Sequence, residues 1–229
     1  MPTAGVICPA RVRAVLERSG MKTAHEMISP HLGQGCRIVG LTMGQFSLLD
    51  LIRAVLSFGG PAHVSLSTWT VGIRDAETAR WLLDTGEIRS MRFLTDRSFA
   101  TRQPGYCKAL VEKFGEGAIR VTKTHAKFAL VRGRLDVCIR SSMNLNRNPR
   151  YEQFDLDESP ELCDFFENLI STMEEQMPPG PVVASAKVDR IFNRVRGGDP
   201  RRIEKRGPAD DARRRLVDSY KIGYRGDCD

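Results

Sequence analysis

The side chains that could do chemistry gather between residues 122 and 152. A histidine and a lysine stand two residues apart, as His125 and Lys127, just before an apolar run that indicates a β-strand. Residues at positions i and i+2 of a strand point to the same face. Lysine resists burial unless an anion compensates its charge, so this pair indicates a site that holds a phosphate group.

A second polar group follows a short turn at residues 132–134. Ser142 and Asn144 again stand two residues apart, and Glu152 lies eight residues further on. The turn between two apolar runs predicts a hairpin. Antiparallel pairing of its strands would bring this second group near the histidine–lysine pair.

Alternating helix and strand signals must position these residues. Ser47 begins a Ser-x-x-Asp capping pattern, and Pro104 and Pro160 stand where a helix begins. Such alternation is typical of a sheet covered by helices on both faces, in which ligands collect at the carboxyl ends of the strands. We expect strands at 37–42, 63–71, 90–94, 118–131 and 135–141, and helices at 10–18, 47–57, 75–84, 104–114, 159–175 and 186–195.

The ordered set resembles the motif of the phospholipase D superfamily. That motif is His-x-Lys, four residues, an aspartate, a Gly/Ser-Ser-x-Asn stretch and a later glutamate; here it reads His125-Ala-Lys127, Ser141-Ser142-Met143-Asn144 and Glu152. The resemblance covers residues 36–176. It implies an α/β fold, a phospholipase D-like α/β/α sandwich with a mixed, mostly parallel sheet. Two positions depart from the motif: Arg132 replaces the aspartate, and Ser141 replaces a glycine.

The resemblance also implies a phosphodiesterase that uses two histidines and neither a metal nor another cofactor. One histidine attacks phosphorus, and the other protonates the leaving oxygen and then activates water. Lys127 and Asn144 would grip the non-bridging oxygens. Ser142 would position the phosphate, and Glu152 would hydrogen-bond the imidazole and fix its tautomer.

The chain contains a single His-x-Lys, because His25, His31 and His63 have no lysine two residues further on. The implied mechanism needs two histidines at one phosphate. We therefore expect a homodimer with a composite site across a two-fold interface, as in the single-motif nucleases of the family.

The net charge of the chain indicates which class of molecule it binds. The chain has 229 residues with 35 Lys and Arg against 28 Asp and Glu, a net charge of +7, of which +5 falls in residues 182–229. A basic balance favours nucleic acid, with DNA favoured over RNA, and the chain lacks the long apolar run of a membrane span. Expected phosphate contacts are Asn146 and Arg147 after the motif, and Arg201, Arg202, Arg213, Arg214 and Arg215 near the C-terminus.

The chain divides into four expected parts. They are an N-terminal helical segment at 1–35, the phospholipase D-like domain at 36–176, a proline-rich linker at 177–181, and a basic, partly flexible arm at 182–229. Residues 1–8 lack the pattern of a secretory signal, and the six cysteines contain no Cys-x-x-Cys pair. These features favour a cytoplasmic protein with reduced thiols and no metal site.

Two alternatives to a nuclease stay open. Arg132 favours a catalytically weak or inactive protein that keeps the fold and serves in DNA binding or as a scaffold. A lipid hydrolase is less favoured, because no amphipathic anchor is found. Trp69 and Asp96, near the ends of expected strands, could border the site or be structural.

Overall fold

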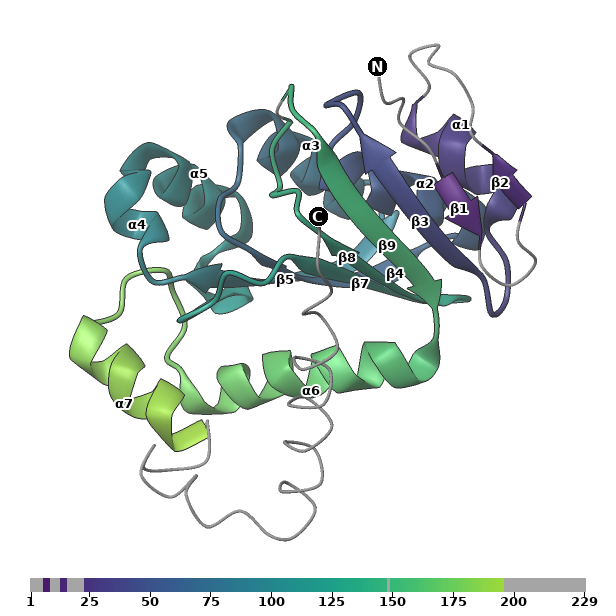
Figure 1. The fold of residues 1–229 in the computed structure, drawn as a ribbon. Helices are drawn as coiled ribbons and strands as arrows, with labels where there is room; N and C mark the ends of the chain where they lie inside the picture. The colour runs from purple at the N-terminus through teal and green to yellow at the C-terminus, as the bar shows by residue number, and fades with distance from the viewer. Residues whose placement is uncertain (1–5, 9–12, 16–22, 148, 196–229) are drawn as a thin grey trace, which may run out of the picture. The chain divides into compact units, whose positions relative to one another are not determined.

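A computed structural model of the chain describes residues 6–8, 13–15, 23–147 and 149–195 (Figure 1). One compact unit spans Met1–Phe192; of the second, Asn193–Asp229, only the end of one helix is described. The strands are β1 Val6–Cys8, β2 Arg13–Val15, β3 Arg37–Thr42, β4 Ala62–Thr68, β5 Ile88–Asp96, β6 Ile119–Thr122, β7 Phe128–Arg132, β8 Asp136–Ser141 and β9 Glu152–Glu158. The α-helices are α1 Ala24–Ile28, α2 Leu48–Gly59, α3 Ile73–Asp84, α4 Phe99–Arg102, α5 Pro104–Phe114, α6 Pro160–Gln176 and α7 Ser185–Val195.

The strands form one mixed sheet in the order β2-β1-β3-β9-β8-β7-β4-β5-β6. The expectation of a mostly parallel sheet is wrong. Among the described strands only β4–β5 and β5–β6 pair in parallel, and the other six pairs are antiparallel. The reason is that β7, β8 and β9 form an antiparallel block between β3 and β4, although β3 and β4 are consecutive strands joined by a helix.

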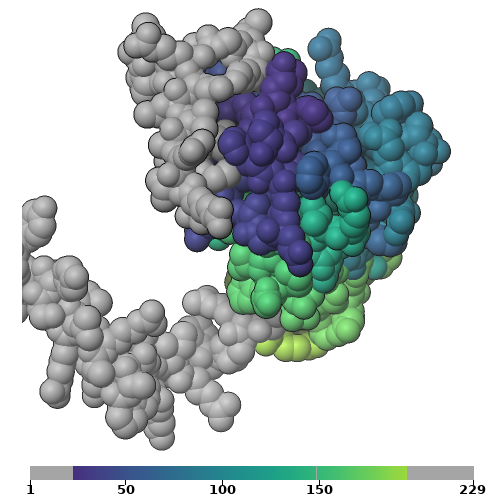
Figure 2. All heavy atoms as spheres, turned by 90° about the vertical axis from the view of Figure 1, so that its right-hand side faces the viewer, coloured from purple at the N-terminus to yellow at the C-terminus, as the bar shows by residue number. Residues whose placement is uncertain are grey.

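Helices cover both faces of the sheet, as an α/β/α sandwich requires. Figure 1 shows α6 along one face, and α2 and α3 behind the other. Figure 2 shows the same separation from the side, with purple and blue residues of the first helices above and the green and yellow-green residues of α6 and α7 below. The α/β class and the two-faced covering are therefore confirmed.

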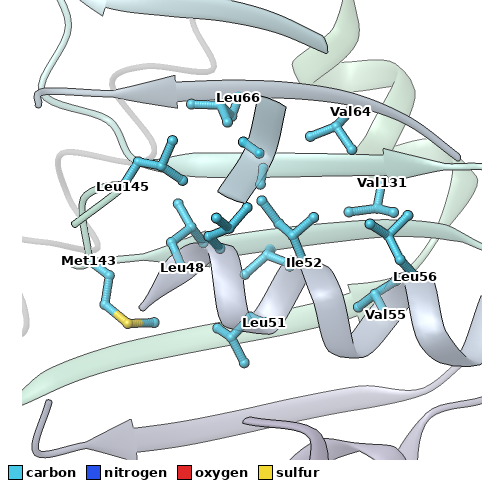
Figure 3. Packing of buried hydrophobic residues seen from close by; sticks show 14 of the residues in the cluster. Leu48, Leu51, Ile52, Val55, Leu56, Val64, Leu66, Val131, Met143 and Leu145 are labelled. Atoms are coloured by element: carbon cyan, nitrogen blue, oxygen red, sulfur yellow. The ribbon is translucent and has the colours of Figure 1, made fainter. Parts of the chain in front are cut away.

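The larger core lies between the sheet and α2. Ser47 caps this helix, accepting a hydrogen bond from the Asp50 N–H while the Asp50 side chain accepts from the Ser47 N–H, and the capping box expected at Ser47 is confirmed. The apolar side chains of the helix meet those of the central strands (Figure 3). Members labelled there include Leu48, Leu51, Ile52, Val55, Leu56, Val64, Leu66 and Val131, all buried.

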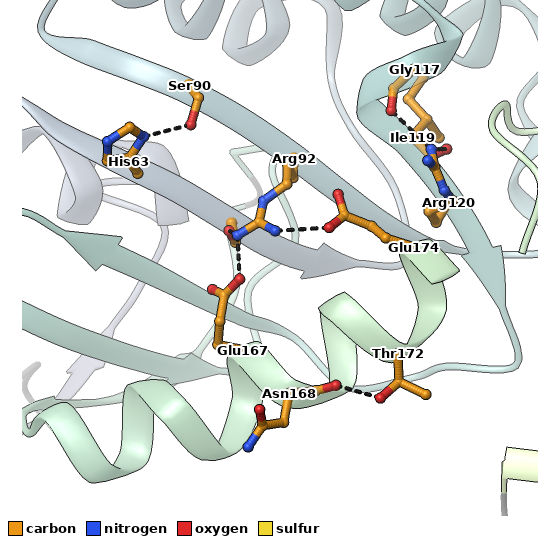
Figure 4. Close-up of polar contacts among 11 residues, drawn as sticks. His63, Ser90, Arg92, Gly117, Ile119, Arg120, Glu167, Asn168, Thr172 and Glu174 are labelled. Atoms are coloured by element: carbon orange, nitrogen blue, oxygen red, sulfur yellow. Dashed lines mark hydrogen bonds and ion pairs between the residues drawn. The ribbon is translucent and has the colours of Figure 1, made fainter. Parts of the chain in front are cut away.

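The α6 face of the sheet combines apolar packing with a half-buried cation. Phe128, Leu130 and Cys138 pack against Cys163 and Ile170 of the helix. Figure 4 shows Arg92 of β5 between Glu167 and Glu174 of α6, with Nη1 2.9 Å from the Glu174 carboxylate. These contacts hold α6 on the sheet through both burial and charge pairing.

Three expectations about local structure need correction. Residues 118–131 are not one strand, because β6 ends at Thr122 and β7 begins at Phe128. Strand β9 was not foreseen. A helix at 10–18 is wrong where the structure describes it, since Arg13–Val15 is a strand; the remaining residues of that span lie outside the described part. The short helix expected at 186–195 is confirmed as α7.

Candidate active site

His125 lies in a connection that crosses the carboxyl edge of the sheet. Strand β6 is at the end of the sheet, whereas β7 pairs with β4 on its far side, so residues 123–127 must pass the ends of β5 and β4. The sequence indicated that His125 and Lys127 lie on one face of a strand. This expectation is wrong, because both residues precede β7, which begins at Phe128. The crossing nevertheless leaves His125 exposed at the edge where ligands bind in such sheets.

Short polar side chains hold this connection in place. The Asp96 carboxylate, at the end of β5, accepts a hydrogen bond from the Thr124 N–H at 3.2 Å. Ser67 of β4 donates to the Ala126 carbonyl at 2.9 Å, and the Thr124 hydroxyl accepts from the Ala126 N–H at 3.1 Å. Residues on both sides of His125 are thus fixed while its own ring stays open to solvent. Asp96 borders the candidate site.

Lys127 occupies a half-buried position next to the start of β7. Its Nζ donates to the His125 carbonyl oxygen at 3.1 Å. Burial lowers the pKa of Lys127; the negative charge of Glu152 opposes that shift, and the positive charge of Arg150 adds to it. A cation that its surroundings only partly compensate is suited to receive an anion.

Glu152 sits at the centre of a polar cluster at the start of β9. It is buried, with a relative exposure of 6%. Its Oε2 accepts a short hydrogen bond from the Ser142 hydroxyl, and its Oε1 accepts from Arg150 Nε at 2.5 Å. Strand β9 pairs with β8, which brings Glu152 beside the end of the hairpin. Sequence spacing did not indicate how far this carboxylate is buried.

Asn144 is also buried, with a relative exposure of 4%. Its Oδ1 accepts a hydrogen bond from the Trp69 N–H at 3.1 Å. The Trp69 ring in turn meets the His125 ring edge-on, with centroids 5.6 Å apart. Trp69 therefore connects the histidine of one motif to the asparagine of the other, and it lines the candidate site.

The structure thus brings together most of the expected set, with one exception. Ser142 donates a hydrogen bond to Glu152, and the charge of Glu152 acts on the pKa of Lys127. Trp69 contacts the His125 ring and donates its N–H to Asn144. Among the described residues, however, His125 and Glu152 form no hydrogen bond, and the Glu152 oxygens accept from Ser142 and Arg150.

Two arginines of the site were missed by the sequence reasoning. Arg150 stands two residues before Glu152, a spacing that on an extended chain places both on one side. Arg102 lies over Trp69, with its guanidinium carbon 3.4 Å from the ring centroid, and donates to the Trp69 carbonyl at 2.9 Å. The Arg150 spacing was readable in the sequence, whereas the Arg102 contact comes from α4 and was not.

The residues expected to contact nucleic acid are distributed differently. Asn146 and Arg147 line a cavity of about 820 Å³ together with Arg74 and Tyr106. Arg147 also donates to the Gly44 carbonyl at 2.9 Å. Arg201, Arg202, Arg213, Arg214 and Arg215 lie outside the described residues.

Arg132, which replaces the motif aspartate, points to the α6 side. It forms ion pairs with Asp136 at 2.9 Å and Asp164 at 2.7 Å. This position therefore contributes to the attachment of α6 rather than to the cluster around Glu152.

In the described part of the chain, no three His, Cys, Asp or Glu side chains are grouped so that they could hold a metal ion. The helices described there also include none of the length and apolarity needed to cross a bilayer.

Comparison with known proteins gives structural likenesses only. No family model and no curated protein matches the sequence. NucT from Helicobacter pylori is 13% identical, with a TM-score of 0.44 over 62% of this chain and 99% of that one. Nuc from Salmonella typhimurium, described as a phospholipase D family member, is 12% identical, with a TM-score of 0.48 over 62% and 96%.

A third similar structure is TrmBL2, described as an archaeal chromatin protein with a novel mode of DNA binding. It is 13% identical, with a TM-score of 0.40 over 62% of this chain and 52% of that one. At these identities and TM-scores the likenesses add nothing about activity or the roles of residues.

Proposed function

We propose that this protein is a metal-independent phosphodiesterase that cleaves nucleic acid at a site shared by two copies of the chain. The observation that carries the proposal is the gathering of His125, Lys127, Asn144 and the Ser142–Glu152 pair at one edge of the sheet. Imidazole, ammonium, amide and hydroxyl groups together can attack, grip and position a phosphodiester.

The proposed reaction has two displacement steps. In the first, an imidazole nitrogen of His125 attacks phosphorus and a phosphohistidine forms as the bond to the leaving oxygen breaks. That oxygen takes a proton from His125 of the partner subunit. In the second, the partner's His125 accepts a proton from water as the water oxygen attacks phosphorus. The phosphorus–nitrogen bond then breaks and a phosphomonoester is released.

The other site residues act on the phosphate rather than on the bond being broken. Lys127, whose charge is incompletely compensated, would pair with a non-bridging oxygen. Asn144 is buried and fixed through Trp69, so its amide group can be held toward the phosphate without reorganisation. Glu152 would orient Ser142 and Arg150 instead of the imidazole, which differs from the role that the motif implies.

A second candidate function is DNA binding without efficient cleavage. Two observations favour it: Glu152 makes no hydrogen bond with His125, and Arg132 stands in place of the motif aspartate with its charge paired to Asp136 and Asp164. An imidazole with no carboxylate to fix its tautomer is a weaker nucleophile and base. Basic charge would still allow the fold to hold DNA.

Cleavage of plasmid and single-stranded DNA in the presence of EDTA tests the first function. Wild type should cleave, and His125→Ala should lose activity by at least about 10³-fold, because the nucleophile is gone. The matched control is His63→Ala, which removes an exposed histidine that is 2.7 Å from Ser90 on another part of the sheet (Figure 4). Cleavage by the His125 variant would reject the assignment, and binding without cleavage by wild type would select the second function.

A mixing experiment tests the shared site. When equal amounts of wild type and His125→Ala are co-refolded, about a quarter of the dimers should contain two histidines, since random pairing of two chains gives that fraction. Activity per wild-type chain should therefore fall to about half. Unchanged activity per wild-type chain would show that each copy works alone.

A further inference from the structure

Arg97 and Lys123 lie close to His125 in the fold, and both form ion pairs with a carboxylate of α7. Arg97 directly follows β5, and Lys123 directly follows β6, two residues before His125. Asp189 of α7 joins them: its Oδ1 is 2.7 Å from Arg97 Nη1 and 2.5 Å from Lys123 Nζ. Two positive charges thus meet at one carboxylate oxygen at the edge that carries the candidate site.

The backbone fixes this pair relative to His125. The Arg97 N–H donates to the Thr122 carbonyl at 3.0 Å, which ties the end of β5 to the end of β6. Asp96, the residue before Arg97, accepts from the Thr124 N–H, the residue before His125. The backbone positions from which the two cations extend are therefore fixed with respect to the histidine without any contribution from Asp189.

Helix α7, which carries Asp189, is anchored by apolar packing, whereas its ion pairs are partly exposed to water. Val188 and Ile191 of α7 are buried against Met173, Met177, Leu94 and Val121, and the Phe192 ring lies 5.5 Å from Lys123 Nζ. The charged side chains remain partly open to water, with exposures of 34% for Arg97, 37% for Lys123 and 40% for Asp189. Ion pairs of this kind are weak and exchange readily, so another anion can replace the carboxylate.

We propose that Arg97 and Lys123 form a subsite for a backbone phosphate of the nucleic acid next to the one at His125, and that Asp189 occupies this subsite when substrate is absent. The inference rests on the proposed nucleic-acid substrate. An arginine with a neighbouring lysine is a recurrent phosphate-binding combination, because the guanidinium supplies a directed fork of donors and the ammonium a compact charge. The Asp189 carboxylate resembles two oxygens of a phosphodiester in charge and geometry.

Binding of labelled DNA, measured by fluorescence anisotropy in the His125→Ala background with EDTA, separates this inference from catalysis. Asp189→Asn should bind up to about fivefold more tightly, which is the value of an exposed ion pair. The matched control is Asp164→Asn, which changes the net charge by the same amount but frees Arg132 on the α6 side. An equal gain in both variants would overturn the inference, because charge alone would then explain it.

The salt dependence of DNA affinity tests whether Arg97 and Lys123 contact phosphates. Combining Arg97→Gln with Lys123→Gln should abolish the gain of Asp189→Asn and reduce the slope of log affinity against log salt by about 1.4 on single strands or 1.8 on duplex, as expected for two lost phosphate contacts. The control pair, Arg89→Gln with Lys108→Gln, removes the same charge at the amino end of β5 and on α5. A slope that does not distinguish the two double variants rejects the subsite.

The outcomes also keep the two proposals apart. If wild type fails to cleave DNA but the Asp189 and salt-slope results hold, the phosphodiesterase proposal is wrong and the subsite stands. If wild type cleaves and the Asp189 variant behaves like its control, the subsite is wrong and the phosphodiesterase proposal stands. If no variant binds DNA, the subsite is rejected.

Discussion

The two halves of the candidate site are built in different ways. The half from β8 and β9 is buried, with Asn144 and Glu152 at 4% and 6% exposure and their oxygens directed to named partners. The half that carries His125 is an exposed connection, anchored through backbone groups by Asp96 and Ser67. The protein thus fixes Asn144, which would grip a phosphate, and leaves His125, which would attack it, open to solvent.

This difference suits a site completed by a second copy. A buried polar cluster needs all its partners within one chain, because an unpaired buried group is costly. An exposed histidine has no such requirement and can meet its counterpart without rearrangement of the core. Effects on stability should therefore belong mainly to the buried half, and effects on activity to both.

Among substitutions expected to lower both activity and stability, the largest combined effect comes from Asn144→Ala. Cleavage should fall by about 10²–10³-fold, as for the loss of one preorganised polar group at a reacting centre. The free energy of unfolding should also fall, by about 1–3 kcal/mol, because the Trp69 N–H loses its acceptor. Urea denaturation and DNA cleavage measure the two effects.

Two controls define that result. His125→Ala should leave the free energy of unfolding within about 0.5 kcal/mol of wild type, since its side chain is exposed. Asn168→Ala, at an exposed position of α6, should change neither property. Equal stability losses in the His125 and Asn144 variants would remove the distinction between the two halves.

The next prediction concerns the packing of β9 against β3. Gly40 of β3 faces Phe154 of β9, and a Cβ at this glycine would lie 2.2 Å from the Phe154 ring, which is fully buried against Phe46. Gly40→Ala should therefore lower the free energy of unfolding by about 1–3 kcal/mol through overpacking. It should also reduce cleavage, because β9 begins at Glu152.

Gly33→Ala is the matched control for this substitution, since a Cβ there would meet nothing within 4 Å. Thermal or urea unfolding of the two variants side by side gives the comparison. Similar stabilities would mean that the contact between β3 and β9 adapts, and that the buried half is less rigid than its hydrogen bonds suggest.

The smallest effect is a gain in stability from Lys127→Met. The folded state lowers the pKa of Lys127 mainly by burial, so keeping this lysine protonated opposes folding. The unfolded chain binds the proton more tightly, and the penalty is fully present below the lowered folded pKa. It disappears as the pH rises through that value toward the unfolded pKa of about 10.4.

Lys127→Met should thus unfold at slightly higher urea concentration at neutral pH, and the advantage should shrink in strongly alkaline buffer. The gain is small because solvent screens a half-buried charge. Lys123→Met is the control: Lys123 is ion-paired with Asp189, so its removal should bring no gain. A variant that is less stable than wild type at neutral pH would show that Glu152 more than compensates the lysine.

Much of the architecture could be predicted because it depends on local patterns. The cap at Ser47 and the prolines at the start of α5 and α6 are properties of short segments, and these helices lie where the sequence placed them. The polar residues of the motif were found for the same reason, since their order along the chain is itself the signal. The break between β6 and β7 was missed because residues 122–127 continue an extended pattern.

The sequence by itself determined which residue types are present, their order, and the helices and strands whose periodicity depends on neighbours along the chain. The tertiary structure decided that β7, β8 and β9 separate β3 from β4, that Trp69 links His125 to Asn144, and that Glu152 turns to Ser142 and Arg150. The physical reason is that strand pairing and side-chain contacts join residues distant in sequence. Their geometry is set by how the whole sheet packs rather than by any local preference.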